Sequence, residues 1–253
     1  MKEKYNWKSL CMAAVLTIGG IILIVASTYV DIEPWISICS GIGCSIIASA
    51  IVIVAHDFII EKVLVSPLDE WGIKKIYATR AEKNADSDPS LEKANYCVDG
   101  IAFGLSSFRT KYSKKVEQCL RKGVNFRLLV MNPNGLFIEA REKEEKGDIK
   151  PSINDLVCWA NALNQKQYKG KIIVKGYNSM TLDFYWRVDN EIYVGPYWYG
   201  YKSSDTITFK YDSSGKAFTL YADYFESLWE NKELTVVLTD VETIAAKKKS
   251  KRR

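Results

Sequence analysis

Two long uncharged stretches near the start of the chain constrain its fold more than any other feature. Residues 10–30 (LCMAAVLTIGGIILIVASTYV) carry no charge, and a second uncharged run over residues 35–55 follows almost at once. At about 1.5 Å per residue, each run is long enough to cross the apolar core of a bilayer. Because lipid offers no partner for backbone polar groups, the runs are expected to be helices. The sequence therefore predicts a two-helix transmembrane hairpin over residues 1–60.

The positive charges predict how the hairpin is oriented. Three lysines lie within residues 2–8 and three more stand at positions 62, 74 and 75, whereas the connection over residues 31–34 has two acids and no lysine or arginine. Positive charges stay on the cytoplasmic side, so we expect both termini there and the chain in the inner (plasma) membrane. A cleaved signal peptide is the alternative for the first run. That run is longer than a usual signal h-region, and the second follows it directly.

Small side chains recur along the second run. Gly41, Ser45 and Ser49 are spaced by four residues and share one face of a helix, where another helix can approach closely. Two partners fit this face: the first run of the same chain, or a second copy of the chain.

Histidine and cysteine usage limits the chemistry of the remainder. His56, at the end of the second run, is the only histidine, so histidine-based catalysis is excluded from the rest of the chain. The six cysteines form no C-x-x-C pair, which leaves zinc and thioredoxin-type chemistry without support. We expect no metal and no cofactor.

The rest of the chain predicts an α/β domain with a mixed sheet. Residues 61–95 are polar and charged, and we interpret them as a linker with a connecting helix over residues 71–83 and a break at residues 85–89. Segments with strand and helix patterns then follow over residues 99–104, 107–122, 126–131, 136–146, 152–166, 171–177, 181–195, 206–211, 218–229 and 233–240. Their alternation, with a hairpin turning at Asp189-Asn190, predicts a domain over residues 96–240. Residues 241–253 form a basic tail that we interpret as solvated, with contact to anionic lipid or nucleic acid as the alternative.

Four features of this domain occur in the order seen in a known family. They are a strand ending G-x-S-x-F at residues 104–108, the strand and turn GVNFRLLVMNPN, the hairpin, and a helix ending FESLW. Residues 99–229 thus resemble one half of a phospholipase D superfamily domain. Active members combine two such halves, so the resemblance implies a homodimer or higher homo-oligomer.

The working residues of that family are not matched. Active members carry H-x-K-x(4)-D on the first hairpin strand and a G-S-x-N-like turn after the second. With the aspartate placed on Asp189, the histidine and lysine positions hold Leu182 and Phe184, and the asparagine position holds Trp198. Shifting the frame by one residue brings in Asp183, Tyr185 and Asn190 instead. Neither register supplies the nucleophile, so we expect a fold that has lost its hydrolytic chemistry and is not an enzyme.

The strand ends of such a sheet still form a cleft in which a ligand can bind. The residues that we expect to line it are Ser106, Ser107, Arg109, Asn132, Asn134, Asp183, Tyr185, Arg187, Tyr197, Trp198 and Lys202. Aromatic faces beside arginine and lysine suit a nucleotide-like ligand. The alternative is that these aromatics pack a core or a dimer face.

Three functions are compatible with this organisation. The first is a membrane sensor-effector resembling bacterial antiphage effectors, in which the cytoplasmic domain detects a nucleotide-like signal or a protein partner encoded nearby and the spans perturb the lipid bilayer. The second is a membrane-associated phosphodiesterase or phospholipase-like enzyme with an unorthodox site. The third is a structural membrane anchor for a partner complex. Nucleic acid is not among the partners that we expect.

Overall fold

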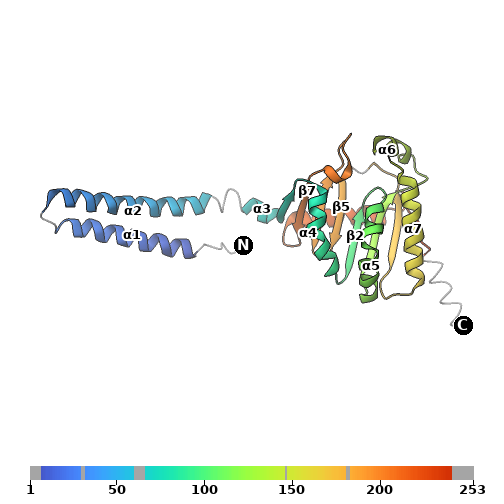
Figure 1. Cartoon of the computed structure of the whole chain (residues 1–253), viewed down its shortest axis with the longest axis horizontal. Helices are drawn as coiled ribbons and strands as arrows, with labels where there is room; N and C mark the ends of the chain where they lie inside the picture. Colours follow the sequence, from blue (N-terminus) through green and yellow to red (C-terminus); the bar gives the residue numbers. More distant parts are fainter. Residues whose placement is uncertain (1–6, 30–31, 60–65, 146, 181–182, 241–253) are drawn as a thin grey trace. The chain divides into compact units, whose positions relative to one another are not determined.

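Two helices form the N-terminal unit of the chain, residues 1–68, in the computed structural model (Figure 1). The structure describes residues 7–29, 32–59, 66–145, 147–180 and 183–240. Helix α1 spans Trp7–Ser27 and α2 spans Glu33–Ile59, with mean hydropathies of 2.5 and 2.4 over their candidate spans. Only 11% of each span is buried, which is unlike the core helices of soluble proteins. The two apolar helices that the sequence predicts are therefore present, and each is long and apolar enough to cross a membrane.

The hairpin packs through glycines that the predicted stripe does not include. A Cβ atom on Gly43 would lie 2.7 Å from the Gly20 carbonyl oxygen, so only glycine allows the two backbones to approach this closely. Gly41, Ser45 and Ser49 are exposed instead, and a Cβ atom on Gly41 would meet nothing within 4 Å. The stripe therefore lies on the face of α2 that is turned away from α1.

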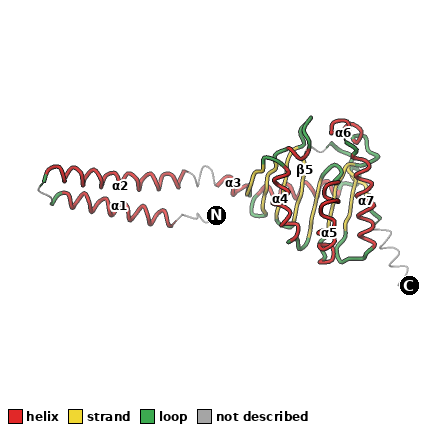
Figure 2. The backbone as a smooth tube through the Cα atoms, viewed as in Figure 1, coloured by secondary structure: helices red, strands yellow, loops and turns green. Residues whose placement is uncertain are grey.

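The second unit, residues 69–253, is built on a mixed sheet flanked by helices (Figure 2). Within its described residues the sheet has eight strands in the order β1-β7-β6-β5-β2-β3-β4-β8. Only β2, β3 and β4 run parallel to one another, and all other neighbours are antiparallel. The strands are β1 (Ile73–Tyr77), β2 (Cys97–Ile101), β3 (Asn125–Met131), β4 (Ile172–Tyr177), β5 (Asp183–Val188), β6 (Glu191–Pro196), β7 (Thr208–Asp212) and β8 (Thr235–Val237). The predicted mixed α/β sheet is confirmed.

The two faces of the sheet carry different helices. One face is covered by α4 (Arg80–Glu92), α5 (Ser106–Lys122) and α7 (Ile149–Gln165), and the other by α8 (Lys216–Glu230). The remaining elements are α3 (Ser66–Trp71), α6 (Ile138–Glu145) and the single turn η2 (Ser203–Asp205). Strand β5 connects both layers because successive side chains point to opposite faces. Trp186 packs against Phe108 of α5, at 4.9 Å between ring centroids, and its neighbour Tyr185 stacks on Phe225 of α8 at 5.3 Å.

The prediction of a linker over residues 61–95 is wrong for most of that segment. Gly72, at φ +72°, ends α3, and β1 then pairs with β7 at the edge of the sheet, where a connecting helix was expected. Helix α4 follows and continues through the predicted break at residues 85–89, with Pro89 inside it. Its buried residues are Arg80, Lys83, Ser87 and Leu91, which recur at helical spacing, so packing against the sheet overrides a poor local propensity.

The other predicted strands and helices occur within a few residues of their expected bounds, including the turn at Asp189-Asn190. The basic tail over residues 241–253, Leu182, and the lysines at positions 2, 4 and 62 lie outside the described residues.

Candidate ligand-binding site

A cavity of about 400 Å³ opens where β2 ends and α5 begins. Its walls come from α4, the loop after β2, the first turn of α5, the pocket-facing side of β5, and the segments that precede α7 and follow β6. The lining includes Arg80, Lys83, Ser87, Phe103, Gly104, Ser106, Ser107, Lys111, Ser152, Phe184, Trp186, Tyr197, Ser203 and Ser204. Its size lies within the range of small-molecule sites, and its lining combines aromatic residues with many polar and charged groups.

The first turn of α5 brings uncapped backbone donors to this cavity. Leu105 occupies the N-cap position with φ 53°, and no side chain caps the helix. The first hydrogen bond across this turn is donated by the Arg109 amide to the Leu105 carbonyl, which leaves the preceding amides without a helical acceptor. Gly104 lets the loop pass close to α7, since a Cβ atom there would lie 3.1 Å from the Ser152 Cβ. The positive end of a seventeen-residue helix thus faces the cavity.

Lys83 is the most unusual group in the lining. Its side chain is buried, with the residue only 3% exposed, and among the described residues it has neither a hydrogen bond nor an ion pair. Its Nζ lies 5.0, 5.3 and 6.0 Å from the ring centroids of Phe184, Tyr193 and Trp186. Burial, reinforced by the positive charges of Arg80 and Lys111 and opposed by Asp88, lowers the pKa of Lys83 to about 7.

Two further cations, Arg80 and Lys111, line the cavity together with the carboxylates of Asp88 and Asp148. Arg80 is almost fully buried; its guanidinium stacks on Phe184 and Tyr197, at 4.2 and 4.8 Å from the ring centroids, and donates to the Thr206 hydroxyl at 3.0 Å. Lys111 lies at the rim and pairs with Asp88 at 3.1 Å. Stacking on aromatic faces compensates part of the cost of burying a guanidinium.

Of the eleven residues predicted to form the site, Ser106, Ser107 and Tyr197 line the cavity and the others do not. Arg109 pairs with Asp155 at 2.8 Å. The Asn132 side chain accepts a hydrogen bond from the Asn134 amide within a turn. Trp198 and Lys202 are exposed beyond Tyr197.

Asp183, Tyr185 and Arg187 were also expected in the site, but alternation along β5 places them on the face covered by α8. There, burial raises the pKa of the Asp183 carboxyl. Phe184 and Trp186, between them, are the β5 residues that reach the cavity.

The sequence prediction missed the contribution of α4, which supplies Arg80, Lys83 and Ser87. One signal could have located this helix. The stretch Thr79-Arg80-Ala81-Glu82 has the spacing of a capping box, and Thr79 Oγ1 does accept from the Glu82 amide at 3.2 Å. The usual apolar periodicity is absent because two of the buried positions of α4 hold a lysine and a serine.

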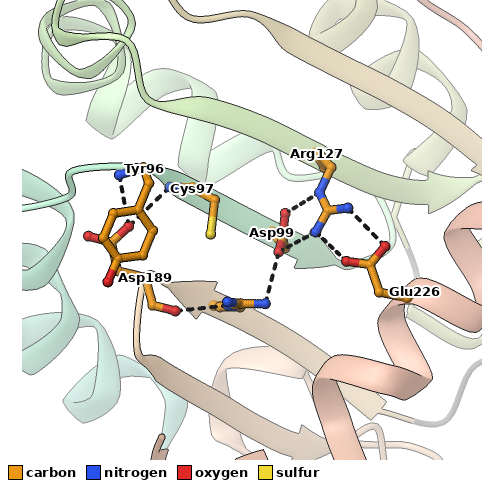
Figure 3. A network of polar contacts seen from close by, with 7 residues as sticks. Tyr96, Cys97, Asp99, Arg127, Asp189 and Glu226 are labelled. Carbon is orange, nitrogen blue, oxygen red and sulfur yellow. Dashed lines mark hydrogen bonds and ion pairs between the residues drawn. The ribbon is translucent and has the colours of Figure 1, made fainter. Parts of the chain in front are cut away.

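The opposite face holds a charged network that is internally satisfied (Figure 3). Asp99, which is 0% exposed, accepts two hydrogen bonds from Arg127 at 2.7 and 2.8 Å, and Arg127 also donates to Glu226 at 2.7 and 2.9 Å. Arg187 lies 3.8 Å from Asp99. A bidentate arginine between two carboxylates is a structural bridge between the sheet and α8.

Asp189, the residue aligned with the family aspartate, also has a structural role. It adopts φ 49° in the hairpin turn, and its carboxylate accepts hydrogen bonds from the amides of residues 95–97 at 2.8 to 3.1 Å. These bonds fix the start of β2 against the hairpin (Figure 3).

No protein-family model and no curated protein matches the sequence. Among solved structures, the chain is similar to Nuc from Salmonella typhimurium, a phospholipase D family member, with 9% identity, 66% of this chain and 99% of that chain covered, and a TM-score of 0.39. It is also similar to phosphatidylserine synthase from Haemophilus influenzae Rd KW20, with 11% identity, coverages of 82% and 48%, and a TM-score of 0.43. TrmBL2, an archaeal chromatin protein, gives 15% identity, coverages of 70% and 59%, and a TM-score of 0.40.

The chain thus spans about half of the synthase and less than two thirds of TrmBL2. Likeness at this level carries no argument about activity, so the function has to be argued from the residues of the cavity.

Proposed function

We propose that this chain is a membrane-anchored sensor whose second unit binds a small ligand in the cavity at the start of α5. One observation carries the proposal, namely the buried ammonium of Lys83 in the cavity wall, which has no hydrogen bond or ion pair among the described residues. A buried charge without a partner is costly to the folded state, and such a cost is retained where a group serves a function. A ligand that enters the cavity would supply the missing partner.

The lining favours binding over turnover. The position aligned with the family lysine holds Phe184, which is part of the aromatic wall, and the sole histidine of the sequence is His56 in α2. Asp189, a candidate for carboxylate chemistry, is occupied by the amides of residues 95–97. The lining also has two carboxylates, of which Asp88 is bonded to Lys111 and Tyr112, while its serine hydroxyls, aromatic residues and cations are groups that hold a ligand.

In the proposal, the membrane helices transmit the signal by self-association. The stripe of Gly41, Ser45 and Ser49 does not contact α1, so it is available to a second copy of the chain. The serine hydroxyls donate to carbonyls of their own helix at 2.9 Å, which lets the stripe face lipid before association. Ligand-dependent assembly that perturbs the bilayer is the plan of an antiphage effector, the setting that we propose.

Filling the cavity tests the sensor function. Ser107→Trp, at the exposed rim, should block the ligand without disturbing the core. Ser227→Trp places the same side chain on the exposed surface of α8, which covers the opposite face, and serves as the control. Native mass spectrometry of the full-length chain, purified from the cells in which it acts, should detect a bound small molecule in the wild type and control but not in Ser107→Trp.

A membrane-potential dye provides the second readout. Cells that express the wild type together with its neighbouring genes should depolarise on triggering, and cells with Ser107→Trp should not. An intact potential in wild-type cells under every trigger would refute the effector function.

The role of the stripe is tested by Ser45→Leu in the full-length chain. This variant should reduce cross-linking between copies in the membrane, whereas Gly19→Leu, at an open position of α1, should not. Equal cross-linking in both variants would show that the stripe is not the interface.

A further inference from the structure

We propose that the ligand of this cavity is a mononucleotide-sized molecule with a phosphate-like anion, and that Lys83 takes up a proton when the anion binds. The inference rests on the proposed function, because it assumes that the cavity holds a ligand. It adds the chemical class of that ligand and a dependence on pH.

The anion is assigned to the place where α5 and Lys83 meet. Ser106, Ser107 and Phe108 form the first turn of α5, line the cavity, and have amides with no helical acceptor. Helix N-termini bind phosphate through such amides, and the hydroxyls of Ser106 and Ser107 add donors of the same kind. Lys83 supplies the independent indication of a negative ligand, because its buried ammonium contacts only aromatic rings and has no ion pair among the described residues, so an anion would stabilise it further.

The rest of the ligand is inferred from the walls. Four aromatic residues, Phe103, Phe184, Trp186 and Tyr197, line the cavity. Aromatic faces of this kind stack on planar heterocycles irrespective of the base. A volume of about 400 Å³ lies at the lower end of the range for small-molecule sites, which fits one nucleotide better than a longer oligonucleotide.

The proton follows from the charges around Lys83. Arg80 and Asp88 lie on its own helix, and Asp88 is already engaged by Lys111 and Tyr112 of α5. Three neighbouring elements also bring titratable groups close to α4. On β6, Tyr193 donates a hydrogen bond to Glu191 of the same strand. Tyr77 of β1 donates to Asp86 of α4, and Asp205 of η2 accepts from its neighbour Ser204. Burial is the largest cause that lowers the pKa of Lys83 to about 7, and the like charge of Arg80 outweighs the opposite charge of Asp88; Asp148 also lines the cavity. An anion that binds beside Lys83 raises the pKa of the lysine, which then takes up a proton.

The pH dependence has a definite sign. Above pH 7 the free site must take up a proton to bind, so affinity should fall about fivefold between pH 7 and pH 8. Below about pH 6 a phosphate monoester gains a proton of its own, which weakens the attraction. Affinity should therefore be highest between about pH 6 and about pH 7.

Calorimetric titration of the full-length protein in detergent tests the inference with AMP, adenosine and sn-glycerol 3-phosphate. AMP should bind at least about tenfold more tightly than adenosine. Lys83→Met should weaken the binding of AMP by about the same factor, because a charge-assisted hydrogen bond is lost. Lys115→Met removes a lysine of α5 that pairs with Glu92 away from the cavity, and it should leave the affinity within about twofold. Titration at pH 8 in buffers of different ionisation enthalpy should reveal proton uptake in the wild type only.

Each contrary result has a distinct meaning. Equal affinity for adenosine and AMP, AMP binding that Lys83→Met leaves unchanged, or no binding of any probe at millimolar concentration would overturn the anion assignment. Tighter binding of glycerol 3-phosphate than of AMP would overturn the nucleotide class in favour of a lipid headgroup. None of these results decides the sensor function, which fails separately if Ser107→Trp leaves both the bound mass and the depolarisation unchanged.

Discussion

Replacing Lys83 with methionine should stabilise the second unit. The ammonium lies over the rings of Phe184, Trp186 and Tyr193 and has no hydrogen bond or ion pair among the described residues. Methionine has a similar length and no charge, so it can occupy the same space without the cost of desolvation. A substitution in a buried position that raises stability is uncommon, which makes the test sharp.

The magnitude follows from the pKa of Lys83, which falls from the ordinary value of 10.5 to about 7. Since one pKa unit corresponds to about 1.4 kcal/mol, keeping this side chain in the folded state costs on the order of 5 kcal/mol at pH 6. Because the pKa of this lysine is lower in the folded than in the unfolded protein, its protonation destabilises the folded state. The cost is fully present below pH 7, declines as pH rises, and is gone above pH 10.5. At pH 9 on the order of 2 kcal/mol remains.

Thermal unfolding of the full-length protein in detergent, followed by tryptophan fluorescence, measures this effect. For a unit of this size 1 kcal/mol moves Tm by about 2 to 4 °C, so Lys83→Met should raise Tm by about 10 to 20 °C at pH 6 and by less than half of that at pH 9. Lys115→Met is the control. Its ion pair with Glu92 lies on the surface, so the Tm of this variant should stay close to that of the wild type at both pH values.

Two results would refute this reasoning. If Lys83→Met lowers Tm, the ammonium has a favourable partner in the folded protein. If the gain in Tm is the same at pH 6 and pH 9, the lysine stays protonated across that range and its pKa is not depressed.

Three further predictions concern packing and structural hydrogen bonds. Arg127→Met leaves Asp99 buried without its bidentate partner and should destabilise the second unit by about 3 to 5 kcal/mol in urea unfolding; a loss below 1 kcal/mol would mean that Asp99 does not depend on this bridge. Asp189→Ala leaves the amides of residues 95–97 without their acceptor and should cost about 2 kcal/mol in the same assay, so an unchanged midpoint would contradict the capping role. Gly43→Ile should force α1 and α2 apart and accelerate hydrogen exchange in both, whereas unaltered exchange would contradict the close packing of the hairpin.

Stability and ligand binding are expected to change in opposite directions at Lys83. A variant that melts at higher temperature yet no longer binds AMP cannot have lost binding through misfolding. Such a trade-off is typical of binding sites, where a charge is kept in an unfavourable environment because the ligand needs it.

The sequence by itself determined the parts of this protein that rest on local chemistry. Uncharged runs long enough to span a bilayer predicted α1 and α2, and alternating strand and helix patterns predicted the mixed sheet and its hairpin at Asp189-Asn190. Composition also limited the chemistry, since His56 is the only histidine. These inferences succeed because hydrophobic periodicity and turn preference act over a few neighbouring residues.

Only the tertiary structure decided which residues meet. Alternation along β5 directs Phe184 into the cavity and Arg187 to the opposite face, a choice that depends on which helix covers each side. Helix α4 escaped prediction because its buried positions include Lys83 and Ser87, and a polar residue signals burial only when its neighbours in space are known. For the same reason the group that carries the proposed function lay in the segment that the sequence indicated to be a linker.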